Sequence, residues 1–151
     1  MDICIKEISG QKIQDALNLS WDVFCKYEAP EYTEEGIKAF HKSLNDPNYI
    51  NMLKVYAAYY DDKIVGTLAT RSNGNHIALF FVNGKYHKNG IGRKLFERAC
   101  NDNLSGEITV NSSPYAIEVY HHLGFKDTNN EQVVDGLRFT PMIWKVNYSH
   151  L

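Results

Sequence analysis

The sequence lacks the features of secreted, zinc-binding and membrane-spanning chains. Its three cysteines, Cys4, Cys25 and Cys100, are an odd number and form no Cys-x-x-Cys pair. This spacing favours neither a disulfide framework nor a zinc site and is typical of reduced thiols. The first residues contain no basic segment followed by an apolar run, and no stretch approaches the roughly 18 consecutive apolar residues of a membrane helix. We therefore expect a cytoplasmic protein without a membrane partner.

An excess of charge of one sign is also missing. The chain carries 16 basic and 18 acidic residues, a net charge of −2 and a pI near 6.3. No global positive field attracts nucleic acid, so we expect no nucleic-acid partner and only local recognition by charge. His121 and His122 are adjacent, but neighbouring side chains on a helix diverge by about 100° and no third ligand is suitably spaced. The sequence predicts no metal site.

The length and the composition of the chain are those of one globular domain. It contains 151 residues, of which 44% are hydrophobic and 23% charged. This composition excludes disorder and fibrous repeats, and a chain of this length buries roughly 68–70% of its unfolded surface. No internal repeat or linker divides the sequence. Residues 1–151 are predicted to form a single domain.

Apolar periodicity predicts one strand and two helices in the first third of the chain. Ile3 and Ile5 alternate with polar residues, as in a short strand. Apolar residues at helical spacing then indicate a first amphipathic helix, at Ile13, Leu17, Trp21 and Phe24. After an irregular stretch at residues 28–31, Thr33 is suited to cap a second helix, which Pro47 is expected to end. The apolar face of that helix is Ile37, Phe40 and Leu44.

Three antiparallel strands are predicted next. Residues 52–60 and 64–70 are rich in strand-forming side chains, and a turn at residues 61–62 separates them. Asn73 and Gly74 mark a second turn before the strand 77–82. That last run is apolar throughout, which is typical of a strand covered on both faces.

The remainder predicts alternating helices and strands. We expect a helix over residues 92–103, a strand over 108–111, and a helix that carries Ala116, Val119, Tyr120 and Leu123 and ends at Gly124. Two strands follow, at residues 125–133 and 137–146, and Pro141 places the last at a sheet edge or at a bulge. The order β-α-α-β-β-β-α-β-α-β-β predicts an α/β fold with a mixed, mostly antiparallel sheet flanked by helices.

The segment between the strand 77–82 and the following helix has the composition of a phosphate-binding loop. Gly90 and Gly92 permit positive φ and a close approach of main-chain amides to an anion at the start of a helix. Residues 85–98 hold five Lys or Arg against one Glu, in a chain that is acidic overall. The alternative is a glycine-rich turn beside a solvated basic helix face.

Two known phosphate loops do not match this segment. A P-loop requires Gly-Lys followed by Ser or Thr, but Gly92 is followed by Arg93. The dinucleotide fingerprint requires a third glycine where this chain has Leu95, and it belongs to a βαβ unit that the preceding antiparallel strands do not provide.

The loop is similar to a different motif. Residues 87–92, His-Lys-Asn-Gly-Ile-Gly, resemble the Gln/Arg-x-x-Gly-x-Gly/Ala loop of the GNAT superfamily of N-acetyltransferases, with His87 where Gln or Arg is usual. The resemblance implies that this loop binds the pyrophosphate of acetyl-CoA. It also implies that the main chain of the preceding strand binds the pantetheine arm. The residues so implicated are Phe80, Phe81, Val82, His87, Lys88, Asn89, Gly90, Ile91, Gly92 and Arg93.

A second segment, residues 116–125, resembles the Ala-x-x-x-Tyr-x-x-x-Gly-Phe segment of the same family. The resemblance implies that Tyr120 lies near the coenzyme sulfur as general acid; the alternative is an aromatic residue of the core. Because a phenol has a pKa near 10 and a thiol one near 8.5, full proton transfer is uphill by about 2 kcal/mol. We therefore expect Tyr120 mainly to hydrogen-bond the developing thiolate.

The sequence does not decide which of two residues just before that segment contacts the coenzyme. Many family members have Asn seven residues before the tyrosine, where this chain has Ser113, and Asn111 lies two residues earlier. Either residue is a candidate. Ser112 or Ser113 is equally suited to cap the following helix.

The acceptor site is expected to be acidic. The attacking amine must be neutral, although an amine of pKa about 10.4 is almost fully protonated at pH 7. Residues 22–35 hold five acidic residues against one lysine, and in family members this region borders the acceptor. We expect a cationic amine acceptor whose proton passes through Glu28 or Glu31 to water; the alternative is a solvated acidic loop.

These observations favour an acetyl-CoA-dependent N-acetyltransferase in which the amine attacks the thioester directly in a ternary complex. No cysteine lies in either motif, so an acetyl-enzyme is not favoured. The sequence leaves two rivals open, a non-catalytic acyl-CoA-binding or sensing module and a structural or interaction domain. Met142 and Trp144 are expected in the core or at an interface, and a homodimer through their strand stays open.

Overall fold

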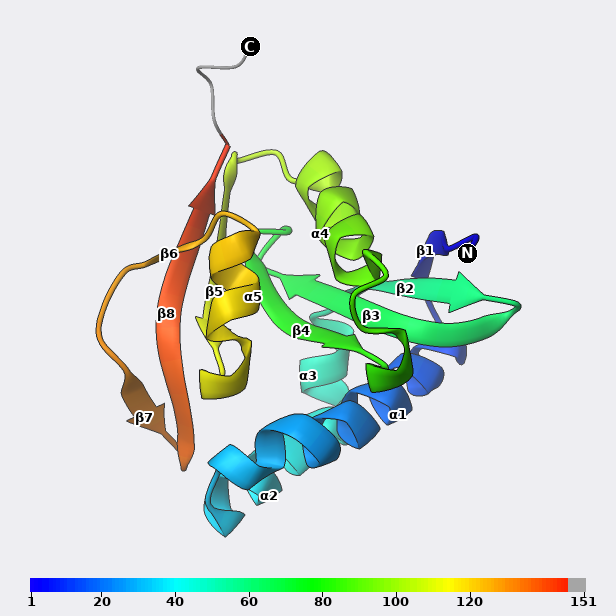
Figure 1. The fold of residues 1–151 in the computed structure, drawn as a ribbon. Helices are drawn as coiled ribbons and strands as arrows, with labels where there is room; N and C mark the ends of the chain where they lie inside the picture. Colours follow the sequence, from blue (N-terminus) through cyan, green and yellow to red (C-terminus); the bar gives the residue numbers. More distant parts are fainter. Residues whose placement is uncertain (147–151) are drawn as a thin grey trace.

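An eight-stranded mixed sheet forms the centre of the computed structural model, which describes residues 1–146 (Figure 1). The strands lie in the order β1-β2-β3-β4-β5-β8-β6, and β7 pairs with β8. All pairs are antiparallel except β4 with β5, which confirms the predicted fold class. The strands are β1 (Cys4–Ile8), β2 (Lys54–Tyr60), β3 (Lys63–Arg71), β4 (His76–Val82), β5 (Glu107–Ser112), β6 (Lys126–Asp127), β7 (Gln132–Val134) and β8 (Leu137–Lys145).

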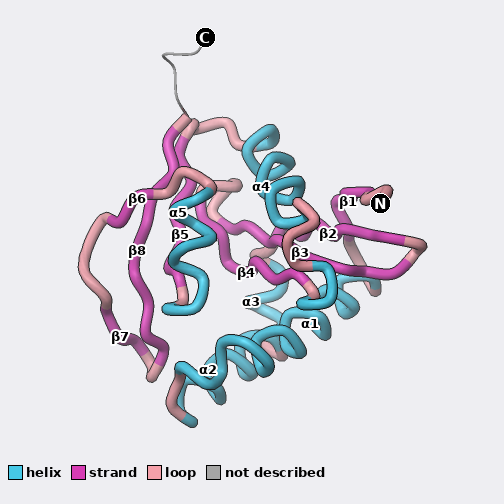
Figure 2. The backbone as a smooth tube through the Cα atoms, viewed as in Figure 1, coloured by secondary structure: helices cyan, strands magenta, loops and turns pink. Residues whose placement is uncertain are grey.

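Helices cover both faces of this sheet (Figure 2). On one face, α1 (Lys12–Val23), α2 (Glu34–Leu44) and α3 (Pro47–Asn51) pack with a core cluster that includes Leu17, Leu44 and Leu79. On the other face, α4 (Ile91–Asp102) and α5 (Ile117–His122) pack with a second cluster that includes Leu95 and Tyr120. Met142 is 1% exposed in the second cluster and Trp144 packs against it, so the core expectation for both is confirmed.

The start of α2 confirms the sequence prediction, but its end does not. The Thr33 hydroxyl accepts a hydrogen bond from the Gly36 amide at 3.3 Å, as a helix cap does. The helix then ends at Leu44, and Pro47 begins the unpredicted helix α3. Asp46 caps that helix by accepting from the Asn48 amide at 2.9 Å. A proline fits the first helical position because no hydrogen bond is required of its nitrogen there.

The strand β4 is covered less completely than its composition predicts. Leu79 and Phe81 are buried, but Ala78 and Phe80 are only half-buried because they line a cavity. The pairing of β3 with β4 also shifts by one residue, between Ala69 and Thr70. Such a bulge bends the strand and re-aims its side chains.

The C-terminal strands require two corrections. The predicted strand 125–133 consists of two short strands, β6 and β7, separated by a loop. The strand β8 lies inside the sheet, between β5 and β6, and not at an edge. The Pro141 carbonyl accepts from the Thr128 amide at 2.8 Å. The nitrogen of Pro141 therefore points to the same side of β8. Because β6 has already ended there, no strand partner requires an N–H from this position, and proline is tolerated.

Candidate active site

The two central strands of the sheet separate shortly after they meet. The strands β4 and β5 pair only at His76 with Thr109 and at Ile77 with Val110, and then diverge (Figure 2). Main-chain groups beyond these pairs have no neighbouring strand on that side. The structure therefore has a gap in the pairing of β4 with β5, bordered by main-chain hydrogen-bonding groups.

The pairing pattern of β4 determines which main-chain groups face this gap. The Asn83 amide donates to the Val65 carbonyl on β3 at 2.8 Å. Because direction alternates along a strand, Phe81 also turns its amide and carbonyl toward β3, whereas Phe80 and Val82 turn theirs toward the gap. Of the three residues implicated by the resemblance, the structure offers Phe80 and Val82. Phe81 is corrected to a residue of the β3–β4 ladder whose side chain is buried.

The predicted phosphate loop ends in an uncapped helix. Gly90 has φ +75° and no side-chain cap, and α4 begins immediately after it. The amides of Ile91, Gly92 and Arg93 occupy the first turn, where no helical acceptor exists, and the Lys94 amide is the first to bond back, to the Gly90 carbonyl at 3.1 Å. With the positive end of the helix dipole, these amides form a site suited to an anion.

The side chains of the loop hold its shape. His87 Nε2 lies 2.9 Å from the Val82 carbonyl oxygen, which can only accept, so the ring donates. The Asn89 side chain donates to two carbonyls of the loop, those of Tyr86 and His87, at 3.1 and 3.3 Å. The Arg93 guanidinium donates to the His122 carbonyl at the end of α5, at 3.4 Å. Lys88 is exposed, and its φ of +68° supports the turn.

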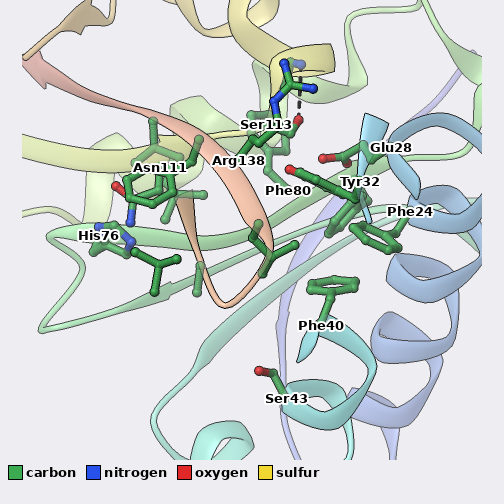
Figure 3. Close-up of a pocket in the computed structure, with 18 of the residues that line it drawn as sticks. Phe24, Glu28, Tyr32, Phe40, Ser43, His76, Phe80, Asn111, Ser113 and Arg138 are labelled. Atoms are coloured by element: carbon green, nitrogen blue, oxygen red, sulfur yellow. Dashed lines mark hydrogen bonds between the residues drawn. The ribbon is translucent and has the colours of Figure 1, made fainter. Parts of the chain in front are cut away.

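A cavity of about 400 Å³ lies beside the gap between β4 and β5 (Figure 3). Its wall contains six predicted site residues, Glu28, Phe80, Phe81, Asn111, Ser113 and Tyr120. Glu31 is absent from the wall; it is exposed, and its Oε2 lies 3.9 Å from Arg138 Nη1. The structure thus brings one of the two candidate proton acceptors to the cavity and leaves the other outside.

Tyr120 comes from α5 and is held by aromatic neighbours. It is 6% exposed, and its ring packs edge-on against Phe80 and Phe125, with centroids 5.9 and 5.3 Å apart. Burial raises the pKa of Tyr120 well above its usual value, and the nearby Glu28 and Tyr32 raise it further. The phenol therefore stays protonated and is available as a hydrogen-bond donor.

Glu28 ends a π-helical turn, Phe24–Glu28, that continues α1. Its side chain is half-buried, and it points into the cavity close to Tyr32 (Figure 3). Burial raises the pKa of Glu28 from 4.5 to about 7, and the neighbouring Ser113 hydroxyl partly offsets this rise. A carboxyl group with this pKa can accept a proton at neutral pH and release it again.

Ser113 and Asn111 both line the cavity at the end of β5. The Ser113 hydroxyl accepts from the Ala116 amide at 3.2 Å, which confirms its capping role before α5. Ser112 is buried and donates to the Ser113 carbonyl at 2.9 Å. Lining of the cavity is compatible with a coenzyme contact by either Ser113 or Asn111, so that prediction stays open.

The sequence did not predict several residues of the wall. Arg71 and His76 come from the β3–β4 hairpin, and Asp135 and Arg138 from the β7–β8 hairpin. No local pattern marks them, because their place depends on which strands become neighbours. Across residues 1–146, no cluster of three or more His, Cys, Asp or Glu is arranged to hold a metal ion. No helix in that range is both long and apolar enough to cross a bilayer.

Comparisons with known proteins agree with this geometry. A family model described as an acetyltransferase (GNAT) domain matches residues 28–146. A GCN5-related N-acetyltransferase from Rhodopseudomonas palustris superposes with a TM-score of 0.79 at 18% identity, covering 95% of each chain. The PaiA N-acetyltransferase from Thermoplasma acidophilum, in complex with coenzyme A, gives 0.75 at 19% identity and covers 96% of this chain and 99% of its own. The ribosomal-protein-S18-alanine N-acetyltransferase of Escherichia coli gives 0.65 at 14% identity, with 97% and 95% covered.

Proposed function

Since this chain belongs to the GNAT acetyltransferase family, we propose that it transfers the acetyl group of acetyl-CoA to a primary amine within a ternary complex. The observation that carries the proposal is one continuous arrangement. The uncapped amides of α4, the free main-chain groups of β4 and the cavity with Tyr120 and Glu28 border the same gap between strands.

The acyl donor is proposed to lie along this gap. The diphosphate binds the amides of Ile91, Gly92 and Arg93, and Lys88 adds positive charge beside them. The amide groups of the pantetheine arm pair with the main chain of Phe80 and Val82, as an added strand does. The His87 ring donates a hydrogen bond to the Val82 carbonyl. When the pantetheine arm binds, His87 has to share this acceptor or release it.

Two side chains, Glu28 and Tyr120, are proposed to assist the reaction, one as a proton acceptor and one as a hydrogen-bond donor. The amine nitrogen attacks the thioester carbonyl carbon, the carbon–sulfur bond breaks, and coenzyme A leaves as a thiolate. Glu28 accepts the proton of the amine, directly or through water, because its pKa of about 7 lies between those of carboxyl groups and amines. The Tyr120 phenol hydrogen-bonds the departing sulfur, and its raised pKa makes this role more favourable than early proton transfer.

Direct attack is supported by the positions of the cysteines. None of the three lines the cavity. Burial raises the pKa of Cys100 to about 12, which keeps its sulfur protonated and unreactive at neutral pH. We therefore propose no acetyl-enzyme intermediate.

The experiment that tests this proposal measures thiol release from acetyl-CoA with a panel of primary amines, in the wild type and in Tyr120→Phe. We expect the substitution to lower kcat by about 10²-fold, in the range of general-acid effects. Affinity for coenzyme A and the melting temperature should change little, because phenylalanine keeps the edge-on contacts with Phe80 and Phe125.

The matched control is Tyr59→Phe on β2, a tyrosine outside the cavity wall, which should keep the wild-type rate. A wild-type kcat in Tyr120→Phe would exclude a role for the phenol. Tight binding of acetyl-CoA without thiol release on any amine would instead favour the non-catalytic acyl-CoA-binding module.

A further inference from the structure

The cavity has two chemically different ends. Figure 3 shows Glu28 and Tyr32 together at one end, and His76 and Asn111 together at the other. Tyr120 belongs to the first end, because its charge interactions are with Glu28 and Tyr32. The reacting amine is proposed to lie at this first end.

Arg71 lies at the second end. It is the last residue of β3, and it stands directly opposite His76 in the β3–β4 pairing. Its charge acts on both His76 and Tyr49, two residues of the cavity wall, which places the guanidinium on the cavity side of the strand.

This guanidinium has no protein partner among residues 1–146. Arg71 makes neither an ion pair nor a side-chain hydrogen bond there, although it is half-buried. By contrast, Arg138, the other arginine of the wall, is paired with Glu131 at 3.2 Å. A guanidinium without a protein partner is free to bind an anionic group, and its partial burial strengthens that interaction.

The neighbours of Arg71 favour a group with a single negative charge. Burial and the charge of Arg71 lower the pKa of His76 to about 4, so the imidazole is neutral at pH 7 and adds no second positive charge. The ring is held in place by the Thr109 hydroxyl, 2.7 Å from Nδ1. One planar guanidinium beside neutral donors matches the geometry and charge of a carboxylate.

The separation of the two ends along β4 favours an elongated acceptor over a compact amino acid. Phe80, against which Tyr120 packs, is four residues beyond His76 on β4, which corresponds to about 13 Å along an extended strand. The bulge in the pairing of β4 and the length of the Arg71 side chain shorten this span. Ile77 and Ala78 lie between His76 and Phe80 in the wall and suit an apolar spacer.

We propose that the acceptor is an elongated amine that carries a carboxylate several bonds from its nitrogen, of the class of ω-amino acids, and that Arg71 binds this carboxylate. This inference rests on the proposed acetyl transfer and names its substrate class. Arg71 acts as a specificity residue and takes no part in the movement of protons.

The test compares ω-amino acids from 4-aminobutanoate to 8-aminooctanoate with the alkylamines of equal chain length, and with glycine as the compact control. The measured quantity is the ratio of kcat/KM for each amino acid to that for its matched amine. In the wild type we expect a ratio of about 10 to 100 for the longer members, since a hydrogen bond to a charged group contributes about this factor. Glycine should be a poor acceptor.

Arg71→Gln should bring the ratio close to one, whereas Arg71→Lys, which keeps the charge without the planar fork, should retain part of it. The matched control is Lys63→Gln, which removes a positive charge from the exposed opposite end of the same strand and should keep the wild-type ratio. Calorimetry with coenzyme A shows whether each variant is folded.

Three results would overturn the inference: equal use of amines and amino acids by the wild type, a preference for glycine, or an unchanged ratio in folded Arg71→Gln. In each of these, acetyl transfer itself is still observed. Failure of the proposed function is a different result, in which acetyl-CoA binds and no member of the panel is acetylated.

Discussion

Two neighbouring side chains, Glu28 and Tyr120, divide the proposed chemistry between them. Burial raises the pKa of both, but from different starting values. The pKa of the Glu28 carboxyl group lies near 7, so the group can accept a proton at neutral pH. The raised pKa of Tyr120 keeps its phenol protonated. When Glu28 ionises, its negative charge raises the pKa of Tyr120 further. Burial beside the same cavity thus prepares an acceptor and a donor.

The pH dependence of the reaction should report Glu28. Its pKa is raised to about 7, so the carboxyl group is mostly protonated below pH 7 and mostly ionised above it. If ionised Glu28 accepts the amine proton, wild-type kcat/KM rises with pH through about 7. Glu28→Gln should have a lower rate and lack this inflection, in rate profiles measured from pH 5.5 to 9 with one amine.

Glu31→Gln makes the matched comparison, because Glu31 lies three residues away and outside the cavity wall. The inflection near pH 7 should persist in this variant. An inflection that disappears in Glu31→Gln and persists in Glu28→Gln would assign the proton acceptor to Glu31 and reverse the proposal.

At the scale of elements, the start of α4 depends on two glycines that have different tasks. Gly90 adopts φ +75°, a conformation that side chains with a Cβ rarely take. Gly92 is helical, and a Cβ there would meet the nearest Phe80 atom at 3.5 Å, an ordinary contact. The loop conformation therefore needs glycine at position 90 and tolerates alanine at 92, in agreement with the Gly/Ala alternative in the motif.

This difference predicts opposite outcomes for two similar substitutions. Gly90→Ala strains the loop by about 1–2 kcal/mol and displaces the free amides, so affinity for coenzyme A should fall about tenfold. Gly92→Ala should change affinity less than about threefold on the same scale. Isothermal titration calorimetry measures both. Equal losses in the two variants would show that the amides of this helix are not the diphosphate site.

At the scale of the whole molecule, the sheet consists of two halves with a weak junction. The strands β1 to β4 form one half and β5 to β8 the other, and the halves meet in only two paired positions. A molecule bound between β4 and β5 contacts both halves. Binding of the acyl donor should therefore act on the stability of the entire sheet.

Coenzyme A should raise the melting temperature. At a concentration 100 times Kd, binding contributes about 2.7 kcal/mol, which corresponds to roughly 5–10 °C for a domain of this size. Differential scanning calorimetry measures the shift. Hydrogen exchange gives the internal control: the amides of Phe80 and Val82 should become protected, and that of Phe81, already turned toward β3, should not. Protection of all three, or of none, would contradict the proposed position of the pantetheine arm.

Much of the fold was predictable because its signals are local. Alternation, helical spacing and turn residues placed nearly every strand and helix, and the cap at Thr33 agrees in detail. The errors at Pro47 and Pro141 have a common origin. A proline lacks an N–H donor, and whether a donor is needed at that position depends on the neighbouring element.

The sequence by itself determined the order of the elements, the two motifs and the resemblance to an acetyltransferase, since each is carried by residues close together in the chain. Only the tertiary structure decided that Glu28 and not Glu31 faces the cavity, that Phe81 turns away from the gap, and that Arg71 stands at the far end. These facts depend on the π-helical turn after α1, the bulge in the β3–β4 pairing and the separation of β4 from β5. The positions of these features relative to one another are set by how the strands pair and the helices pack on the sheet, which no local pattern of residues encodes.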